Sequence, residues 1–138
     1  MIDFFAAIQT KFDDSTEQAA IDLRALLTSF KYGKGDQGGL LPYGVYFGGE
    51  SLPDNVFRGS IDIVPVQMNF YSDYKRSASQ CFQALRLAKD LFNNTILPVD
   101  NHYNILLSKI MEVPPKNIDD IRWMAVIEFN CLLQKREV

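Results

Sequence analysis

The chain has 138 residues, a length typical of one folded domain that buries a sizeable core without disulfides or metal ions. Hydrophobic residues make up 47% of it and aromatic residues 12%, a composition that excludes a disordered chain. The formal net charge of −3 provides no basic surface of the kind that binds nucleic acids, so we expect no sequence-specific nucleic-acid partner.

The sequence also argues against export and membrane insertion. Residues 1–5 lack the basic region and apolar run of a signal peptide. No apolar run reaches the roughly 20 residues that a membrane-spanning helix requires, so we expect no membrane partner. The two cysteines, Cys81 and Cys131, form no Cys-x-x-Cys pair, which predicts buried, reduced thiols in a reducing cytoplasm.

Apolar residues at helical spacing dominate the N-terminal part of the chain. They occupy roughly one side of a short helix over residues 2–12, which the polar residues 13–15 interrupt. A second set shares one helix face over residues 16–30. We therefore predict two helices, with residues 1–14 as a possible extra N-terminal helix, and keep a single helix over residues 3–30 as the alternative.

Two predicted loops flank a short predicted strand at residues 41–47. Residues 31–41 are rich in glycine but lack the P-loop motif, which favours a loop over a phosphate site. Residues 48–59 form a long connection, and such loops in compact domains are often functional. Its apolar and basic tip contains Phe57 and Arg58, which we expect to contact a partner if the tip is exposed, or to pin the loop if it is buried.

The stretch from Ser60 to Asn94 predicts one strand that leads directly into one helix. Alternating β-branched and aromatic residues over 61–71 indicate the strand. Within it, Pro65 argues for an edge position or a bulge, because proline has no N–H for the ladder. Ser72-Asp73 offers N-cap oxygens for a helix that continues to about Asn93.

That helix has an unusually wide apolar surface. At 100° per residue, a cluster that includes Cys81, Phe82 and Phe92 is extended far around the cylinder by Leu87 and Leu91. The arc is roughly twice the ~100° that a helix lying on one sheet needs, so a second surface should cover its flank. Either the N-terminal helix or a neighbouring subunit is expected there, which makes Leu87 and Leu91 candidate subunit contacts.

The C-terminal part predicts an antiparallel hairpin. Residues 103–113 have strand composition, residues 114–117 indicate a turn, and residues 121–133 carry the longest alternating pattern. The polar residues 134–138 are expected to fray. The outward-facing side chains of the last strand that are still apolar, and are therefore candidate interface residues, are Met124, Val126 and Leu132.

The order of these elements is helix or helices, two strands, one helix and two strands. It predicts one α+β domain over residues 1–138, built in two layers. The sheet is expected to be antiparallel, possibly mixed, with about four strands. The N-terminal helix or helices and the one central helix are expected to pack on it.

No group of residues in the sequence predicts catalysis. The single histidine, His102, has no cysteine or carboxylate at ligand spacing. The adjacent carboxylates at residues 13–14 and 119–120 are typical of solvated turns. We therefore expect no catalytic residue, no cofactor and no metal, and a protein that is not an enzyme.

The succession of motifs nevertheless resembles a known family. Leu23-Arg24-Ala25-Leu26-Leu27 is followed by Leu41-Pro42-Tyr43-Gly44-Val45-Tyr46 and, after a loop, by residues 64–73, which lead into a helix at 75–93. This order resembles the tail terminator, or tail completion, and head-tail joining proteins of long-tailed phages. The likeness spans roughly residues 19–133. The extra N-terminal helix, the glycine-rich loop and Pro65 depart from the family pattern.

The resemblance implies a structural protein of a phage or prophage tail, located in the virion and assembled in the host bacterial cytoplasm. Members of this family form hexameric rings that cap the completed tail tube and join it to the head. The implied partners are therefore other copies of the chain, the tail tube protein and the head-tail connector protein. Ring contacts are then expected at Phe57, Arg58 and the exposed face of the last strand.

The alternative is a small-ligand binding module or an enzyme with a pocket in a curved α+β sheet. It depends on the same element order and on aromatic side chains that could line a cavity. These side chains are Tyr43, Tyr71, Tyr103 and Trp123. A deep closed pocket with converging polar groups would favour this alternative.

Overall fold

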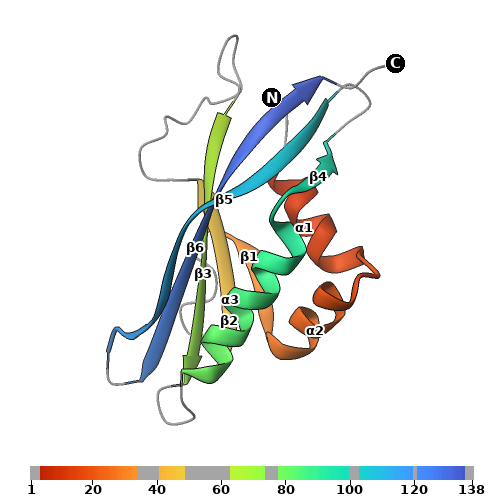
Figure 1. Ribbon diagram of the computed structural model, residues 1–138. Coiled ribbons are helices and arrows are strands. Elements are labelled where there is room, and N and C mark those ends of the chain that lie inside the picture. Colours follow the sequence, from red (N-terminus) through yellow and green to blue (C-terminus); the bar gives the residue numbers. More distant parts are fainter. Residues whose placement is uncertain are drawn as a thin grey trace.

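The computed structural model describes residues 4–33, 41–48, 63–73, 78–99, 103–119 and 121–135, which form three helices and one six-stranded sheet (Figure 1). The helices are α1 (Phe4–Asp14), α2 (Gln18–Leu26) and α3 (Ser79–Phe92). The strands are β1 (Ser29–Tyr32), β2 (Tyr43–Gly48), β3 (Ile63–Asp73), β4 (Thr95–Pro98), β5 (Tyr103–Asn117) and β6 (Arg122–Lys135).

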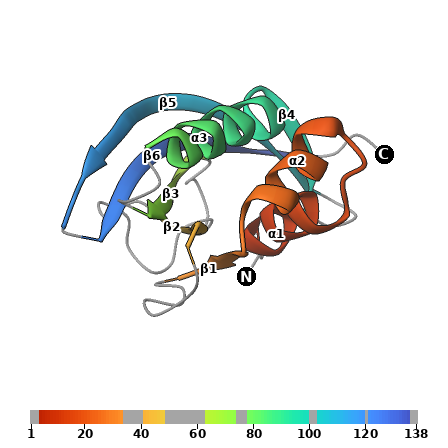
Figure 2. The same ribbon diagram turned by 90° about the horizontal axis from the view of Figure 1, so that it is seen from below.

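The sheet has the strand order β1-β2-β3-β6-β5-β4 and is mixed, as the sequence allowed. β1 runs parallel to β2, and the other neighbouring strands are antiparallel. The sheet curves around the helices, which all lie on one side of it (Figure 2). α1 packs against both β1 and β4, the first and last strands of the sheet. We call the opposite side of the sheet the helix-free face.

The sheet has six strands where the sequence predicted about four, because β1 and β4 are too short to show an alternating pattern. The second helix ends at Leu26 and not at Phe30, which lies in β1. The Thr28 backbone N–H donates to the Pro42 carbonyl at 2.8 Å and brings this segment beside β2. A four-residue strand joined to its neighbour by such tertiary contacts leaves little signal in the sequence.

The N-terminal region forms two helices, so the alternative of one long helix is wrong. α1 ends at Asp14, and α2 begins at Gln18. Between them, the Ser15 hydroxyl accepts a hydrogen bond from the Glu17 backbone N–H at 3.2 Å. Such local side-chain bonds compete with helical hydrogen bonds and favour a break in the helix.

The wide apolar arc of α3 predicted that either an N-terminal helix or a neighbouring subunit covers its flank. In the structure, α2 of the same chain packs against this flank. The residues that face inward are Cys81, Ala84, Leu85, Ala88, Leu91 and Phe92. Phe82, which the helical projection placed in this inward cluster, is 53% exposed instead. The predicted N-cap at Ser72-Asp73 is also wrong, because β3 continues to Asp73 and α3 begins at Ser79.

A row of three residues across β1, β2 and β3 forms a dense part of the core. Phe30 lies opposite Gly44, and Gly44 lies opposite Phe70. The two phenyl rings have their centroids 6.1 Å apart and are nearly parallel, at 12°. A Cβ atom at Gly44 would lie 2.9 Å from both rings, so a glycine is required for this close approach.

The C-terminal hairpin is longer than predicted. β5 continues through residues 114–117, where the sequence indicated a turn, and its register with β6 shifts between Lys109 and Met111 and between Val113 and Lys116. β6 extends to Lys135, so residues 134–135 belong to a strand and not to a frayed tail. The hairpin therefore runs along the whole length of α3 (Figure 1).

The strand prolines occupy different positions in the sheet. Pro65 lies opposite Asn130 in the regular ladder between β3 and β6, so the predicted edge position or bulge is not found on that side of β3. Pro114-Pro115 lies on β5 past Leu107, the last residue of β5 that pairs with β4 in the described part of the chain, and at a register shift against β6. This second location follows the general confinement of strand prolines to edges and irregularities.

Candidate assembly surfaces

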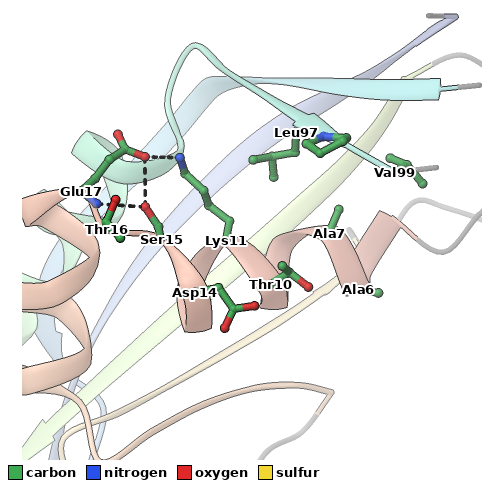
Figure 3. Close-up of a pocket in the computed structure, with 11 residues that line it drawn as sticks. Ala6, Ala7, Thr10, Lys11, Asp14, Ser15, Thr16, Glu17, Leu97 and Val99 are labelled. Atoms are coloured by element: carbon green, nitrogen blue, oxygen red, sulfur yellow. Dashed lines mark hydrogen bonds and ion pairs between the residues drawn. The ribbon is translucent and has the colours of Figure 1, made fainter. Parts of the chain in front are cut away.

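A groove of about 500 Å³ lies between α1, the beginning of α2 and β4 (Figure 3). One row of α1, with Ala6, Thr10 and Asp14, forms one side of it, and Leu97 and Val99 form the other. The side chains along α1 are small, so the groove is open to a bulky group from outside. We call it the α1–β4 groove. Its remaining lining residues are Ala7, Lys11, Ser15, Thr16, Glu17 and Pro98.

The charges in the α1–β4 groove leave one carboxylate uncompensated. The Lys11 ammonium forms an ion pair with the Glu17 carboxylate, which also accepts a hydrogen bond from the Ser15 hydroxyl at 3.2 Å. The hydrogen bond from Lys11 is the main reason why the pKa of Glu17 lies below its usual value. The Asp14 carboxylate makes no hydrogen bond or ion pair with the side chain of any other described residue, so the lining of the groove carries one unpaired negative charge.

The opposite end of the molecule exposes apolar side chains on the C-terminal hairpin. Ile118 is 36% exposed and Ile121 is 63% exposed. Lys116 is exposed beside them, and its ammonium pairs with no carboxylate in the described ranges. We call Lys116, Ile118 and Ile121 the hairpin end. It lies at the left in Figures 1 and 2, whereas α1 lies at the right in both.

Arg122 fixes the hairpin end to the body of the sheet. Its guanidinium donates to the Asp119 carboxylate at 2.9 and 3.1 Å and to the Tyr43 hydroxyl at 3.1 Å. Its central carbon lies 5.2 Å from the centroid of the Tyr71 ring, a cation–π distance. Asp119 also accepts from the backbone N–H of Ile121, which is the main cause of its lowered pKa. These contacts link the hairpin end to β2 and β3.

A second groove, of about 630 Å³, lies between α2, α3 and β5. The exposed Phe82 and the partly buried Leu87 line it together with Pro115. Its polar residues include Asp22 and Arg86, which have opposite charges. Leu87, a predicted interface residue, is therefore accessible from outside through this groove.

The other predicted interface residues have different environments. Leu91 is fully buried in the core of its own chain, so its assignment as a subunit contact is wrong. Met124, Val126 and Leu132 lie on the helix-free face, but Val126 is only 6% exposed, whereas the other two are half-buried. Phe57 and Arg58 lie outside the described residues, as does His102.

Polar side chains on the helix-free face form hydrogen bonds with one another. The Gln67 side-chain amide donates to the Asn69 side-chain oxygen at 2.9 Å, and the Asn69 amide donates to the Tyr71 hydroxyl at 3.3 Å. Leu132 lies opposite Ile63, which is 50% exposed, so these two side chains form an apolar pair at one end of this face.

Sequence reasoning did not find the α1–β4 groove or the hairpin end. The groove combines side chains from three segments, α1, the beginning of α2 and the region of β4, and no local pattern links them. The hairpin end left a weak signal, since Ile118 and Ile121 are apolar residues on either side of two aspartates. A turn with large apolar residues on both sides is a reasonable place to search for a contact surface.

The described part of the chain contains no group of three or more His, Cys, Asp or Glu side chains placed to hold a metal ion. None of its helices has the length and apolar character needed to span a bilayer.

No protein-family model matches the chain, and no curated protein sequence matches it. Among solved structures, the chain is similar to one in a structure titled "Virion of native gene transfer agent (GTA) particle". The TM-score is 0.61, the alignment covers 94% of this chain and 93% of that chain, and the sequence identity is 13%. The protein thus shares its fold with a chain of a gene transfer agent virion.

Proposed function

We propose that the protein is a structural component of a phage-like tail, similar to tail terminators, that forms a ring on the tail tube and joins it to the head connector. The observation that carries this proposal is the fold likeness over 94% of the chain to a chain in a virion structure. The order of motifs from residues 19 to 133, which resembles the tail terminator family, supports the same assignment.

The distribution of exposed apolar residues is consistent with ring formation. A closed ring requires two different surfaces on each subunit, which meet in a head-to-tail contact. The chain has one candidate surface at the hairpin end and another at the α1–β4 groove, on opposite sides of the molecule. In this proposal the ring is a hexamer, and the chain acts in assembly and not as an enzyme.

The proposed location is the virion tail, after assembly in the host bacterial cytoplasm. The partners are other copies of the chain, the tail tube protein and the head-tail connector protein. Met124 and Leu132, which are half-exposed on the helix-free face, and Leu87, which lines the second groove, are the described residues proposed to contact these partners. Phe57 and Arg58 are proposed contacts on the segment between β2 and β3.

The ring is tested with the purified full-length protein by native mass spectrometry and analytical ultracentrifugation, followed by negative-stain electron microscopy. The same measurements are repeated with tail tubes of the virus whose genes lie beside this one. We expect hexameric rings, either in solution or at one end of the tube. A protein that stays monomeric alone and does not bind the tube would refute the proposal.

The ligand-binding alternative gains no support from the placement of the aromatic residues. Tyr43 and Tyr71 have their ring centroids 5.0 Å apart on the helix-free face, where Arg122 also contacts them. Trp123 packs against the core on the other side of the sheet. These three side chains therefore do not line one cavity, and the Tyr103 side chain lies outside the described part.

A further inference from the structure

The hairpin end and the α1–β4 groove complement each other in shape. The hairpin end projects two exposed isoleucines, Ile118 and Ile121. The groove has an apolar wall of Pro98 and Val99 and the small side chains of Ala6 and Thr10 along α1, so it can accept branched side chains. Neither surface is covered within the described chain, and each would lose exposed apolar area if they met.

The two surfaces also complement each other in charge. Lys116 at the hairpin end has no carboxylate partner in the described part of the chain, and Asp14 at the rim of the groove has no cationic partner there. Lys11 is paired with Glu17 in the groove, and Arg122 is paired with Asp119 beside the hairpin end. A contact between the two surfaces would bring Lys116 of one copy close to the Asp14 carboxylate of the next copy.

The two surfaces cannot meet within one chain, because they lie on opposite sides of the molecule in both views (Figures 1 and 2). A second copy of the chain can supply the missing half. Such a contact uses different surfaces on the two copies, so repeating it generates a ring or a filament and not a two-fold dimer.

We propose that the hairpin end of one copy docks into the α1–β4 groove of the next copy, with Lys116 facing Asp14 and with Ile118 and Ile121 against Pro98 and Val99. This inference rests on the proposed ring and specifies the contact that builds it. Arg122 is a positioning residue for this contact, because it holds the hairpin end through Asp119, Tyr43 and Tyr71.

Disulfide trapping tests the contact directly. The variant with both Ile121→Cys and Thr10→Cys should form a covalent ladder, up to the full ring, on non-reducing gels after mild oxidation. Each single variant should remain monomeric on the same gel, since a head-to-tail contact never brings two equivalent residues together. The native Cys81 and Cys131 are buried and should stay silent. The control pair Ile121→Cys with Asp90→Cys, on the exposed side of α3, should give no ladder.

Charge exchange provides an independent test. Lys116→Glu or Asp14→Lys alone should raise the concentration needed for half-assembly, by about two- to ten-fold at low salt, as expected for an exposed ion pair. The double exchange should restore assembly. Lys116→Glu combined with Asp90→Lys, on the exposed side of α3, should not restore it. Circular dichroism and melting curves of each variant identify any change in folding.

The outcomes separate this inference from the proposed ring. Rings together with the specific ladder and the charge rescue support both. Rings without a ladder above the control pair, or without rescue by Asp14→Lys, overturn the docking contact and leave the ring intact. A wild-type protein that remains monomeric with and without tail tubes overturns both.

Discussion

Gly44→Ala tests the packing at the centre of the fold, because Gly44 separates Phe30 and Phe70 in adjacent strands. The added methyl group would lie 2.9 Å from both rings, closer than carbon atoms in contact approach. Phe30 is also packed against Phe92 of α3, with ring centroids 6.4 Å apart, so the rings have little room to move away. The substitution should therefore strain the core.

The expected cost follows from two opposing effects. Overpacking of a tight core costs about 1–3 kcal/mol. Replacing glycine by alanine also reduces the entropy of the unfolded chain, which returns about 0.5–1 kcal/mol. We expect a net loss of about 1–2 kcal/mol in the free energy of unfolding. At about 2.1 cal/mol/K per residue, 138 residues have an unfolding entropy of about 0.29 kcal/mol/K, so Tm should fall by about 3–7 °C.

The matched control is Gly48→Ala in the same strand. A Cβ atom there would lie 3.8 Å from the nearest atom of Phe5, an ordinary contact distance. This variant should be as stable as the wild type or slightly more stable. Urea and thermal unfolding are followed by circular dichroism at two protein concentrations, because assembly would make Tm depend on concentration. If Gly44→Ala melts at or above the temperature of Gly48→Ala, the argument from the two rings is wrong.

Three further predictions concern the charged contacts and the thiols. Arg122→Met should lower the free energy of unfolding by about 1 kcal/mol, as expected for a half-exposed ion pair. The control Arg86→Met, on the exposed side of α3, should leave the free energy of unfolding nearly unchanged. Equal effects of the two substitutions would refute a role for the Asp119 and Tyr43 contacts. In an NMR titration, the pKa of Asp119 should lie below the usual aspartate value of about 3.9, chiefly because its carboxylate accepts a hydrogen bond from the Ile121 N–H. The stability that the Asp119 carboxylate contributes should therefore be present at neutral pH and lost as the pH falls through the lowered pKa. Burial raises the pKa of Cys81 to about 11 and of Cys131 to about 12, so both thiols should resist Ellman's reagent at pH 8 until urea unfolds the chain. The free energy of unfolding should also decline as the pH rises from about 9 toward these values, because the thiols of the unfolded chain then release protons that those of the folded chain keep. Rapid labelling of either thiol in the folded protein would contradict its burial.

The sequence predicted the elements that carry a strong periodic pattern. The alternation over residues 61–71 and 121–133 identified β3 and β6, which are neighbours at the centre of the sheet. Tyr46 was predicted to point away from Val45 and Phe47, and its hydroxyl indeed donates to the Gln9 side chain of α1 at 2.8 Å. In these segments one face is buried by helices, so the pattern in the sequence directly reflects the layers of the fold.

The errors arose where tertiary contacts outweigh local preference. Phe30 continues the helical spacing of α2, but it lies in β1, where it stacks between Phe70 and Phe92. Pro114-Pro115 is a strong local turn signal, yet β5 passes through it because that part of the strand lies beyond β4. Neither outcome can be deduced without knowing which segments are neighbours in space.

The candidate interface was predicted less well than the fold. Leu91 was selected because the apolar arc of α3 is too wide for one sheet, which left a helix of the same chain or a neighbouring subunit as the cover. α2 covers that flank and leaves Leu91 fully buried. The α1–β4 groove and the hairpin end depend on the curvature of the sheet and on the length of the C-terminal hairpin. Periodicity determines the inward side of an element and carries no information about either property.

The contact of α1 with both β1 and β4 has a consequence for the order of folding. α1 and β1 are close in the sequence and can associate soon after both leave the ribosome. β4 is synthesised much later, so α1 can contact β4 only when most of the chain has been made. Contacts between such distant segments slow folding, and until β4 is in place the incomplete sheet remains open to pairing with other chains. A nascent copy is therefore most vulnerable to incorrect strand pairing shortly before its own α1 and β4 come into contact.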